Sequence, residues 1–356
     1  MENTKARYFR YTLHFREPAG TSRGVLREKD TWFLLLSRGD VSALGECAMF
    51  RGLSCDDVPG YEGKLDEVCR AINRGEVVDF ASLADYPSIR FGLECAHGTL
   101  LAREEGKEFL ASDFTAGLAA IPVNGLVWMG DFERMARRLE EKIEAGYRCI
   151  KIKIGAIDFG EELTLLHRIR QRYNENDIEI RVDANGAFSP GDALERLKCL
   201  SDFRLHSIEQ PIRAGQWAQM ARLCRETPLP IALDEELIGV NIPEEKRRLM
   251  EEIKPQYIVL KPSLVGGMAS CREWIDLAEA SVAGFWLTSA LESNVGLDAI
   301  ARFSYLCKPA IPQGLGTGAL YTDNVDYPFE IQGGMFRITG KVPGAERVLE
   351  ALRKQN

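Results

Sequence analysis

Cys149-Ile150-Lys151-Ile152-Lys153-Ile154-Gly155 is a stretch in which lysine alternates with isoleucine. A period of two is typical of a β-strand, because successive side chains of a strand point to opposite faces. The isoleucines can therefore be buried against helices while Lys151 and Lys153 point into a common interior. Two ammonium groups crowded away from water favour a neutral lysine, which could act as a general base near neutral pH. Taken alone, the stretch favours an antiparallel edge strand whose lysine face is solvated, and the runs that follow it change this interpretation.

Four more strand-like runs follow the double-lysine stretch at a regular spacing. Three of them end in a carboxylate and the fourth ends in lysine: Ile178–Asp183, Leu205–Glu209, Leu229–Asp234 and Tyr257–Lys261. The ends of successive runs lie 25 to 27 residues apart, which is the length of one strand, one helix and two short loops. Parallel strands in a closed barrel bring their carboxyl ends to one rim. We therefore expect three acids and three lysines to converge there.

The chain divides into two kinds of sequence. Residues 1–118 predict an α+β domain, because alternating strand patterns come first and helical spacing follows. Within them, residues 18–24 are rich in small side chains and predict either a mobile flap or a plain hairpin connection. Residues 119–324 repeat strand and helix and predict the barrel. The final segment, 325–356, is expected to pack back on the first domain.

Composition argues against several classes of partner. The net charge of −8 comes without a basic block, so neither nucleic acid nor an anionic membrane surface is expected as a partner. No apolar run approaches the ~20 residues of a membrane span, and a cytoplasmic protein is expected. Nine scattered cysteines without a Cys-x-x-Cys pair predict reduced thiols rather than a disulfide framework. The sequence leaves the oligomeric state open.

Three carboxylates at adjacent strand ends make an all-oxygen site. Asp183, Glu209 and Asp234 would suit Mg²⁺, which prefers oxygen ligands and keeps positions for water or substrate. The alternative is that the acids are helix caps or ion-pair partners. Lys153 and Lys261 lie on strands that flank the acids from opposite sides. This arrangement favours proton abstraction next to a carboxylate, with a lysine as base and the metal stabilising the enediolate.

Several short motifs resemble the signature of the enolase superfamily, muconate-lactonizing subgroup. In chain order these motifs are Lys151-x-Lys153, Arg181-Val-Asp183-Ala-Asn185-Gly186, Ile208-Glu209-Gln210-Pro211, Leu233-Asp234-Glu235 and Leu260-Lys261-Pro262. The resemblance implies an α/β fold, a modified TIM barrel of the (β/α)7β type under an N-terminal α+β capping domain. It also implies Mg²⁺ on the three acids, with Mn²⁺ as a possible substitute.

Within that subgroup the chain is most similar to lyases that convert 2-succinyl-6-hydroxy-2,4-cyclohexadiene-1-carboxylate to 2-succinylbenzoate. The points of similarity are Arg181 two residues before the first acid, the segment Ser289-Ala-Leu-Glu-Ser293 and the loop Gly314-Leu-Gly-Thr317. The resemblance implies that Lys153 abstracts the proton and then protonates the departing hydroxide, a syn elimination. Lys261 would stabilise the anionic intermediate, and Lys151 would tune Lys153. Loops 18–24 and 50–54 would close over the substrate, a small carboxylate. The implied substrate contacts are Arg181, Asn185, Ser289, Gly314, Gly316 and Thr317.

Two alternatives stay open beside this dehydration. Both lysines of a two-base racemase are present, so an N-acylamino acid racemase is one alternative. A dipeptide epimerase is less well supported, because the last barrel loop lacks the Asp-x-Asp pair that the resemblance leads us to expect of such enzymes. A barrel that binds a ligand without catalysis is the alternative of another class, and the retention of every acid and lysine argues against it.

Overall fold

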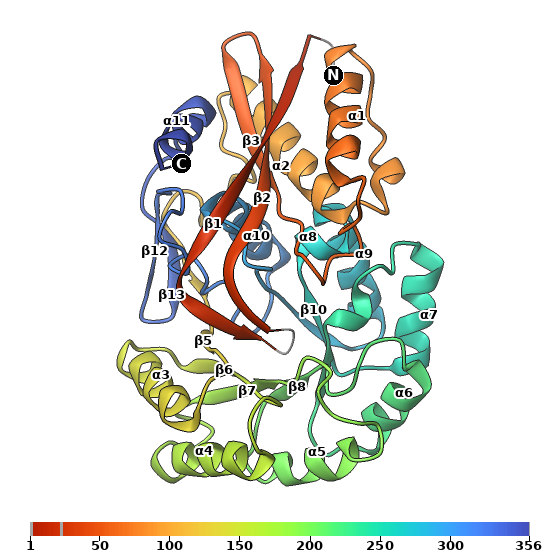
Figure 1. Cartoon of the computed structure of the whole chain (residues 1–356), viewed down its shortest axis with the longest axis vertical. Coiled ribbons are helices and arrows are strands. Elements are labelled where there is room, and N and C mark those ends of the chain that lie inside the picture. Colours follow the sequence, from red (N-terminus) through yellow and green to blue (C-terminus); the bar gives the residue numbers. More distant parts are fainter. Residues whose placement is uncertain (1–2, 22–23, 356) are drawn as a thin grey trace.

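The computed structural model describes residues 3–21 and 24–355 and arranges them in two layers (Figure 1). The upper layer is an antiparallel sheet with two helices against one face. Its strands are β1 (Lys5–Thr21), β2 (Gly24–Arg38) and β3 (Val41–Cys47), in the order β1-β2-β3, and its longer helices are α1 (Tyr61–Asn73) and α2 (Pro87–Glu104). The lower layer is a curved parallel sheet ringed by helices. The predicted α+β domain and barrel are thus both present.

The segment predicted as a flap or a hairpin connection is part of a long hairpin. Ala19 pairs with Leu26 and Gly20 with Val25, so the strand pairing of β1 and β2 runs through most of this segment. Residues 22–23 lie outside the described part of the chain. The described residues therefore support the hairpin rather than a separate loop. Its end reaches the barrel, where Gly20 bridges to Met129.

The barrel sheet contains seven parallel strands in sequence order, so the double-lysine stretch is not the antiparallel edge strand that we considered. The strands are β5 (Gly125–Val127), β6 (Cys149–Lys153), β7 (Glu179–Asp183), β8 (Ser207–Glu209), β9 (Ile231–Leu233), β10 (Tyr257–Leu260) and β11 (Gly284–Leu287). An eighth strand position is filled by the segment 313–314. Gln313 bridges to Val123, and Gly314 bridges to Thr288, both in parallel. These bridges join the two edges of the sheet, as the (β/α)7β prediction requires.

The helices of the barrel lie between successive strands and begin at local signals. They are α3 (Phe132–Glu144), α4 (Phe159–Arg172), α5 (Ala193–Ser201), α6 (Trp217–Glu226), α7 (Pro243–Ile253), α8 (Pro262–Val265), α9 (Gly267–Ala280) and α10 (Asn294–Cys307). Asp131 accepts a hydrogen bond from the backbone N–H of Arg134, and Asp158 accepts one from Gly160. Such caps satisfy N–H groups that the first turn leaves free. Pro243 occupies the first turn of α7, where its missing N–H costs nothing.

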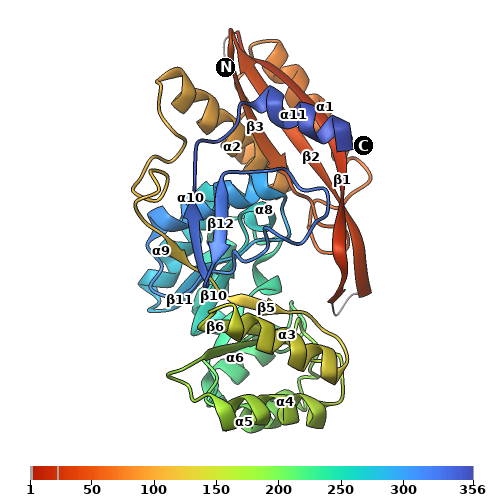
Figure 2. The same ribbon diagram turned by 90° about the vertical axis from the view of Figure 1, so that its left-hand side faces the viewer.

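The C-terminal segment returns to both layers (Figure 2). Strands β12 (Phe329–Gln332) and β13 (Met335–Ile338) form a small sheet with β4 (Ile121–Pro122). Helix α11 (Ala345–Gln355) contacts β3, and Glu346 forms a 3.0 Å ion pair with Arg7 of β1. The end of the chain thus contacts the antiparallel sheet, and the assignment of the segment 325–356 to the first domain stays a prediction. The domain boundaries themselves, at residues 118 and 324, stay a prediction.

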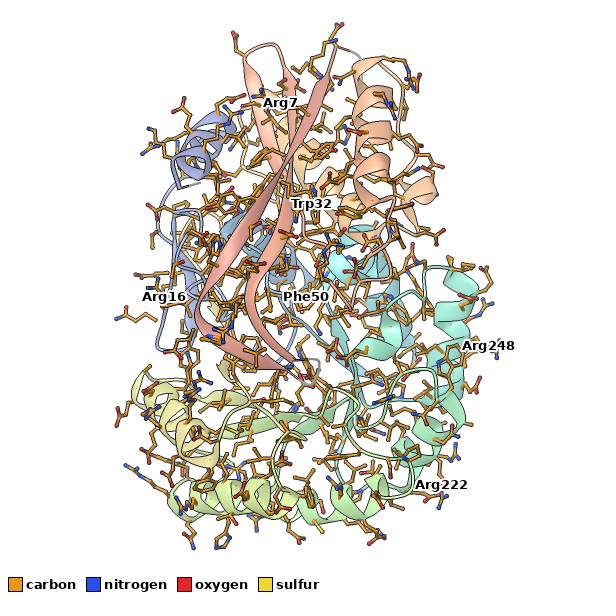
Figure 3. All side chains as sticks on the ribbon, in the orientation of Figure 1. Arg7, Arg16, Trp32, Phe50, Arg222 and Arg248 are labelled. Carbon is orange, nitrogen blue, oxygen red and sulfur yellow. The ribbon has the colours of Figure 1, made fainter. Side chains whose placement is uncertain are left out.

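The side chains of the double-lysine strand separate as its period predicts. Ile150, Ile152 and Ile154 are at most 1 % exposed and belong to the main apolar core, which extends over both layers. Phe50 lies between the capping sheet and the barrel, whereas Arg222 and Arg248 project from outer helices (Figure 3). Within the described ranges, no helix combines the length and apolar character that crossing a membrane would need.

Candidate active site

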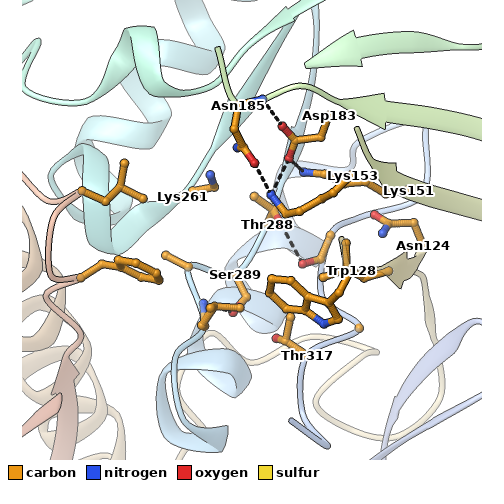
Figure 4. A pocket seen from close by; sticks show the side chains of 17 residues that line it. Asn124, Trp128, Lys151, Lys153, Asp183, Asn185, Lys261, Thr288, Ser289 and Thr317 are labelled. Atoms are coloured by element: carbon orange, nitrogen blue, oxygen red, sulfur yellow. Dashed lines mark hydrogen bonds and ion pairs between the residues drawn. The ribbon is translucent and has the colours of Figure 1, made fainter. Parts of the chain in front are cut away.

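The pairing of neighbouring barrel strands brings the predicted acids and lysines to one rim. Lys153 of β6 pairs with Asp183 of β7, which in turn pairs with Glu209 of β8. Asp234 and Lys261 directly follow β9 and β10. Because these strands are parallel and the five residues lie at their carboxyl ends, their side chains converge (Figure 4 shows Lys153, Asp183 and Lys261).

The three acids form a compact, buried group. Asp183, Glu209 and Asp234 are at most 1 % exposed, and one carboxylate oxygen of each lies within 4.8 Å of the others. Among the described residues, Oε1 of Glu209 is buried without a hydrogen-bond partner. Buried carboxylates at this spacing repel one another unless a cation lies among them. The donor set therefore fits a divalent metal ion, and it contains only oxygen.

Lys151 and Lys153 contact the acids from the side of β6, and Lys261 contacts them from the side of β10. Lys151 donates to Oδ2 of Asp183 at 2.8 Å and also binds Glu209. Lys153 lies 2.9 Å from Oδ2 of Asp183 and donates to Oδ1 of Asn185 at 2.7 Å. Lys261 approaches from the other side, with its Nζ 2.5 Å from Oδ2 of Asp234. The site thus holds two lysine ammonium groups on the side of β6 and a third at the end of β10.

The electrostatics of the site differ in one respect from the sequence prediction. Burial alone lowers the pKa of Lys151, but the charges of Asp183, Glu209 and Asp234 outweigh it and the pKa is raised. Lys261 behaves in the same way, because Asp234 and Glu235 outweigh its burial and raise its pKa. The carboxylates near Lys151 therefore outweigh the desolvation and the lysine–lysine repulsion from which the sequence predicted a neutral amine on one of the two β6 lysines.

The pKa values of Asp183 and Glu209 shift in opposite directions. Lys151 and Lys153 overcome the effect of burial and hold the pKa of Asp183 well below its usual range. Burial raises the pKa of Glu209 to about 7, and the neighbouring Asp183 and Asp234 add to the rise against the opposing charge of Lys151. Asp183 is therefore the more firmly ionised of these two acids.

A pocket lies directly above the acids and is lined from both layers. The capping loop contributes Phe50 and Leu53, as expected for residues 50–54. The site residues predicted from the sequence that line this pocket are Lys151, Lys153, Asp183, Asn185, Lys261, Ser289, Gly314, Gly316 and Thr317. The sequence interpretation missed Asn124, Leu126, Trp128 and Thr288, which also line it. The alternation along the first barrel strand was the available signal for three of these, because residues 124, 126 and 128 share one face.

Arg181 lies apart from the other predicted substrate contacts. Its side chain is fully buried, binds Glu179 at 2.8 Å, donates to the carbonyl oxygen of Pro312 at 2.9 Å and stacks on Trp286. It is absent from the lining of the pocket. In this structure Arg181 connects β7 to the segment that precedes Gly314, which favours a supporting role over direct contact with substrate.

Ser289 lies in the pocket, but its hydroxyl group is already engaged. It donates to Oε2 of Glu292 at 2.6 Å and accepts from the backbone N–H of Leu291 at 2.9 Å. A hydroxyl group has one proton, so while this contact persists Ser289 can accept a hydrogen bond from a ligand but cannot donate one. By contrast, Oγ1 of Thr317 is buried without a hydrogen-bond partner among the described residues.

The fold and the site together define a class of enzyme. Residues 134–345 match the family model described as "Enolase C-terminal domain-like", and the chain belongs to that family, the enolase superfamily. It is 45 % identical to the o-succinylbenzoate synthase of Desulfotalea psychrophila, over 95 % of this chain and 100 % of the relative. The chain is thus an enzyme of this superfamily.

Two further likenesses extend the comparison. The crystal structure of MenC from Desulfotalea psychrophila matches with a TM-score of 0.83 and 42 % identity, over 95 % of this chain and 100 % of that chain. An N-succinylamino acid racemase of Thermus thermophilus is 34 % identical over 46 % of this chain and 42 % of the relative. The first likeness covers the capping layer as well as the barrel, whereas the second covers less than half of each chain.

Proposed function

We propose that this enzyme is a Mg²⁺-dependent o-succinylbenzoate synthase. It removes water from 2-succinyl-6-hydroxy-2,4-cyclohexadiene-1-carboxylate and yields 2-succinylbenzoate. The observation that carries the proposal is the pocket in which Lys153 and Lys261 flank three buried acids, in a chain 45 % identical over nearly its whole length to such a synthase. The product ring is aromatic, so the elimination is strongly downhill and needs little more than a base and stabilisation of charge.

In this mechanism Lys153 is the single acid and base. Its neutral amine takes the proton from the ring carbon that bears the carboxylate, and the electron pair forms an enediolate. The ring C–O bond then breaks, and the ammonium of Lys153 returns its proton to the departing hydroxide, which leaves as water. Asn185 and Asp183 hold Nζ of Lys153 from two sides, at 2.7 Å and 2.9 Å, and so fix its direction.

Lys261 acts by its charge. Its ammonium lies on the side of the acids away from Lys153, where a positive charge stabilises the anionic intermediate. Asp183, Glu209 and Asp234 would hold Mg²⁺, for which Mn²⁺ can substitute, and the bound cation would supply positive charge for the substrate carboxylate. Lys151 contacts two of these acids and so influences the charge that Lys153 experiences.

The remaining pocket residues bind and enclose the succinyl end. Thr317 has a hydroxyl group free to donate, and the backbone at Gly314 and Gly316 lines the same pocket. Neither position has room for a side chain, because a Cβ would lie 2.1 Å from Oγ1 of Thr288 or 2.8 Å from the carbonyl oxygen of Asn124. Phe50 and Leu53 of the capping layer cover the opening and exclude water.

The test is the fall in ultraviolet absorbance when purified enzyme with Mg²⁺ meets the cyclohexadiene carboxylate. Rapid loss that depends on protein concentration is the expected result. No loss above the spontaneous rate, with the protein folded and metal-loaded, would contradict the proposal.

A second candidate is the racemisation of N-acylamino acids. Lys153 and Lys261 both face the pocket, from opposite sides of the acids, so one base is available for each face of a substrate carbon. Polarimetry on N-succinyl and N-acetyl amino acids separates the two activities. Fast racemisation without dehydration would reassign Lys261 from electrostatic partner to second base.

A further inference from the structure

The segment 289–293, here called the pocket turn, contributes three consecutive residues to the pocket wall and has an unusual backbone. Ser289, Ala290 and Leu291 line the pocket. Leu291 has φ +63°, a left-handed conformation that residues with a side chain rarely adopt. Strain of this kind persists only where the surroundings enforce it, and it gathers at functional sites.

Glu292 holds the pocket turn from inside the barrel. Its Oε2 accepts hydrogen bonds from the hydroxyl of Ser289 at 2.6 Å and from the N–H of Ala290 at 2.7 Å, and its Oε1 accepts from Ser263. Ser263 is two residues after Lys261. One buried carboxylate thus joins the pocket turn to the segment that carries the second active-site lysine.

Glu46 of β3 holds the other end of the pocket turn from the capping layer. Its Oε1 accepts from the N–H of Ser293 at 2.9 Å, while its Oε2 accepts from the hydroxyl of Ser293 at 2.5 Å and from the N–H of Gly296 at 2.9 Å. In a capping box, a glutamate in the first turn of a helix reaches back to the N-cap residue. In α10 the N-cap residue is Ser293, and Gly296 occupies the first-turn position where a capping box has its glutamate. Glu46, which is far away in the sequence, accepts the hydrogen bond from the N–H of Ser293 instead.

Gly296 is the residue type that this arrangement requires. A Cβ atom at position 296 would lie 2.8 Å from Oε2 of Glu46 and 2.8 Å from Cβ of Glu292. The Glu46 carboxylate and the aliphatic part of the Glu292 side chain therefore approach a backbone that has no room for a side chain.

We propose that Glu46 of the capping sheet and Glu292 are positioning residues that hold the pocket turn in the shape the substrate site requires. Neither of them lines the pocket, so they act through Ser289, Ala290 and Leu291. The capping layer then does more than cover the pocket, because it fixes one wall of it. This proposal rests on the proposed function for its kinetic test only.

The kinetic test compares Glu46 and Glu94, two glutamates of the capping layer. Each accepts hydrogen bonds from backbone N–H groups at the start of a barrel helix. Glu46→Gln places an NH₂ group against the N–H of either Ser293 or Gly296, because both carboxylate oxygens accept from backbone N–H groups. Glu94 of α2 instead accepts from Met268 at the start of α9, away from the pocket turn. We expect Glu46→Gln to raise KM by about tenfold or more with a smaller change in kcat, because the turn contacts bound ligand. Glu94→Gln is expected to leave both parameters unchanged.

A measurement independent of the reaction follows the pocket turn directly. Amide hydrogen exchange of peptides covering 287–300, in the Mg²⁺-loaded protein, should become faster in Glu46→Gln and stay as in the wild type in Glu94→Gln. Unchanged exchange and unchanged KM in Glu46→Gln would overturn the proposal. Wild-type protein without dehydration activity would contradict the proposed function instead, and the exchange result would still decide the role of Glu46.

Discussion

Lys153 and Asp183 face each other across neighbouring parallel strands, with Nζ of the lysine 2.9 Å from Oδ2 of the aspartate. The proposed base and a proposed metal ligand are therefore in direct contact. Asp183 keeps a second ammonium partner in Lys151, at 2.8 Å. Loss of Lys153 thus leaves Asp183 paired, and the effects of base and metal can be separated by experiment.

Lys153→Ala is expected to abolish turnover while the fold persists. General acid–base catalysis contributes about 10²–10⁴-fold, and Lys153 serves as both acid and base in the proposed reaction. The measurement is kcat for dehydration, with circular dichroism as the check on folding. Lys198→Ala is the matched control, because Lys198 is a half-exposed lysine paired with Glu195 on an outer helix. Activity of Lys153→Ala within about tenfold of wild type would remove Lys153 from the mechanism.

Removal of divalent metal is expected to eliminate activity, and Mg²⁺ is expected to restore it. The physical reason is that an enediolate forms only where positive charge stabilises it, and three buried acids without a cation supply the opposite charge. Dialysis against a chelator followed by titration with Mg²⁺ gives the result. Full activity in protein shown to be metal-free by elemental analysis would contradict the metal assignment.

Asp183→Asn is expected to weaken Mg²⁺ binding by at least about 10–100-fold. Loss of a residue that only supports a metal ligand already weakens binding by this much, and Asp183 is a proposed ligand itself. The substitution keeps the shape of the side chain and removes the charge of the more firmly ionised acid of the pair described above. Titration calorimetry with Mg²⁺ measures the change. Asp192→Asn, at an exposed aspartate that binds Ser189, serves as the control. Equal affinity in Asp183→Asn and wild type would exclude Asp183 as a ligand.

Ile152→Ala is expected to lower the free energy of unfolding by about 2–5 kcal/mol, the usual cost of such a cavity in a core. Ile152 is 1 % exposed and lies on the strand that carries both lysines. Ile242→Ala changes the same side chain where it is 52 % exposed, and a change within about 0.5 kcal/mol is expected there. Denaturant unfolding compares the two variants. Similar small losses would show that the outer face of β6 contributes little to the core.

Asp56→Asn is expected to stabilise the protein more at neutral than at acid pH. Burial raises the pKa of Asp56 to about 6 from its ordinary 3.8, against the opposing hydrogen bonds from Ser88. The folded state therefore binds this proton more tightly, and stability falls as the pH rises from about 4 to about 6. At about 1.36 kcal/mol for each pKa unit, ionised Asp56 lowers the free energy of unfolding by about 3 kcal/mol above that pH range. Asparagine carries no charge and removes this loss.

The check on Asp56 is the Tm difference between Asp56→Asn and wild type at about pH 4.5 and about pH 7.5. A larger gain at the higher pH is expected, since an amide oxygen can still accept both bonds from Ser88. Asp202→Asn, at an exposed aspartate, should show no such pH dependence. A gain that is the same at both pH values would show that Asp56 is ionised throughout.

Much of the barrel and most of the candidate site could be predicted from the sequence, because the information is local. The period of two along residues 149–155 assigns Lys151 and Lys153 to one face, whatever the strand packs against. The spacing from Asp183 to Lys261 repeats one strand and one helix, so parallel strands bring these ends to one rim. The choice of substrate came from resemblance, since no local pattern encodes it.

Only the tertiary structure decided the contacts between residues far apart in the chain. Glu46 binds the N–H of Gly296, a pair separated by 250 residues, and nothing in either neighbourhood predicts the other. The hydroxyl of Ser289 is taken by Glu292, and Arg181 turns to Pro312, because packing fixes those directions. The pKa of Lys151 rises for the same reason: strand spacing placed the acids at the rim, but the distance of each charge from the ammonium is a property of the folded chain.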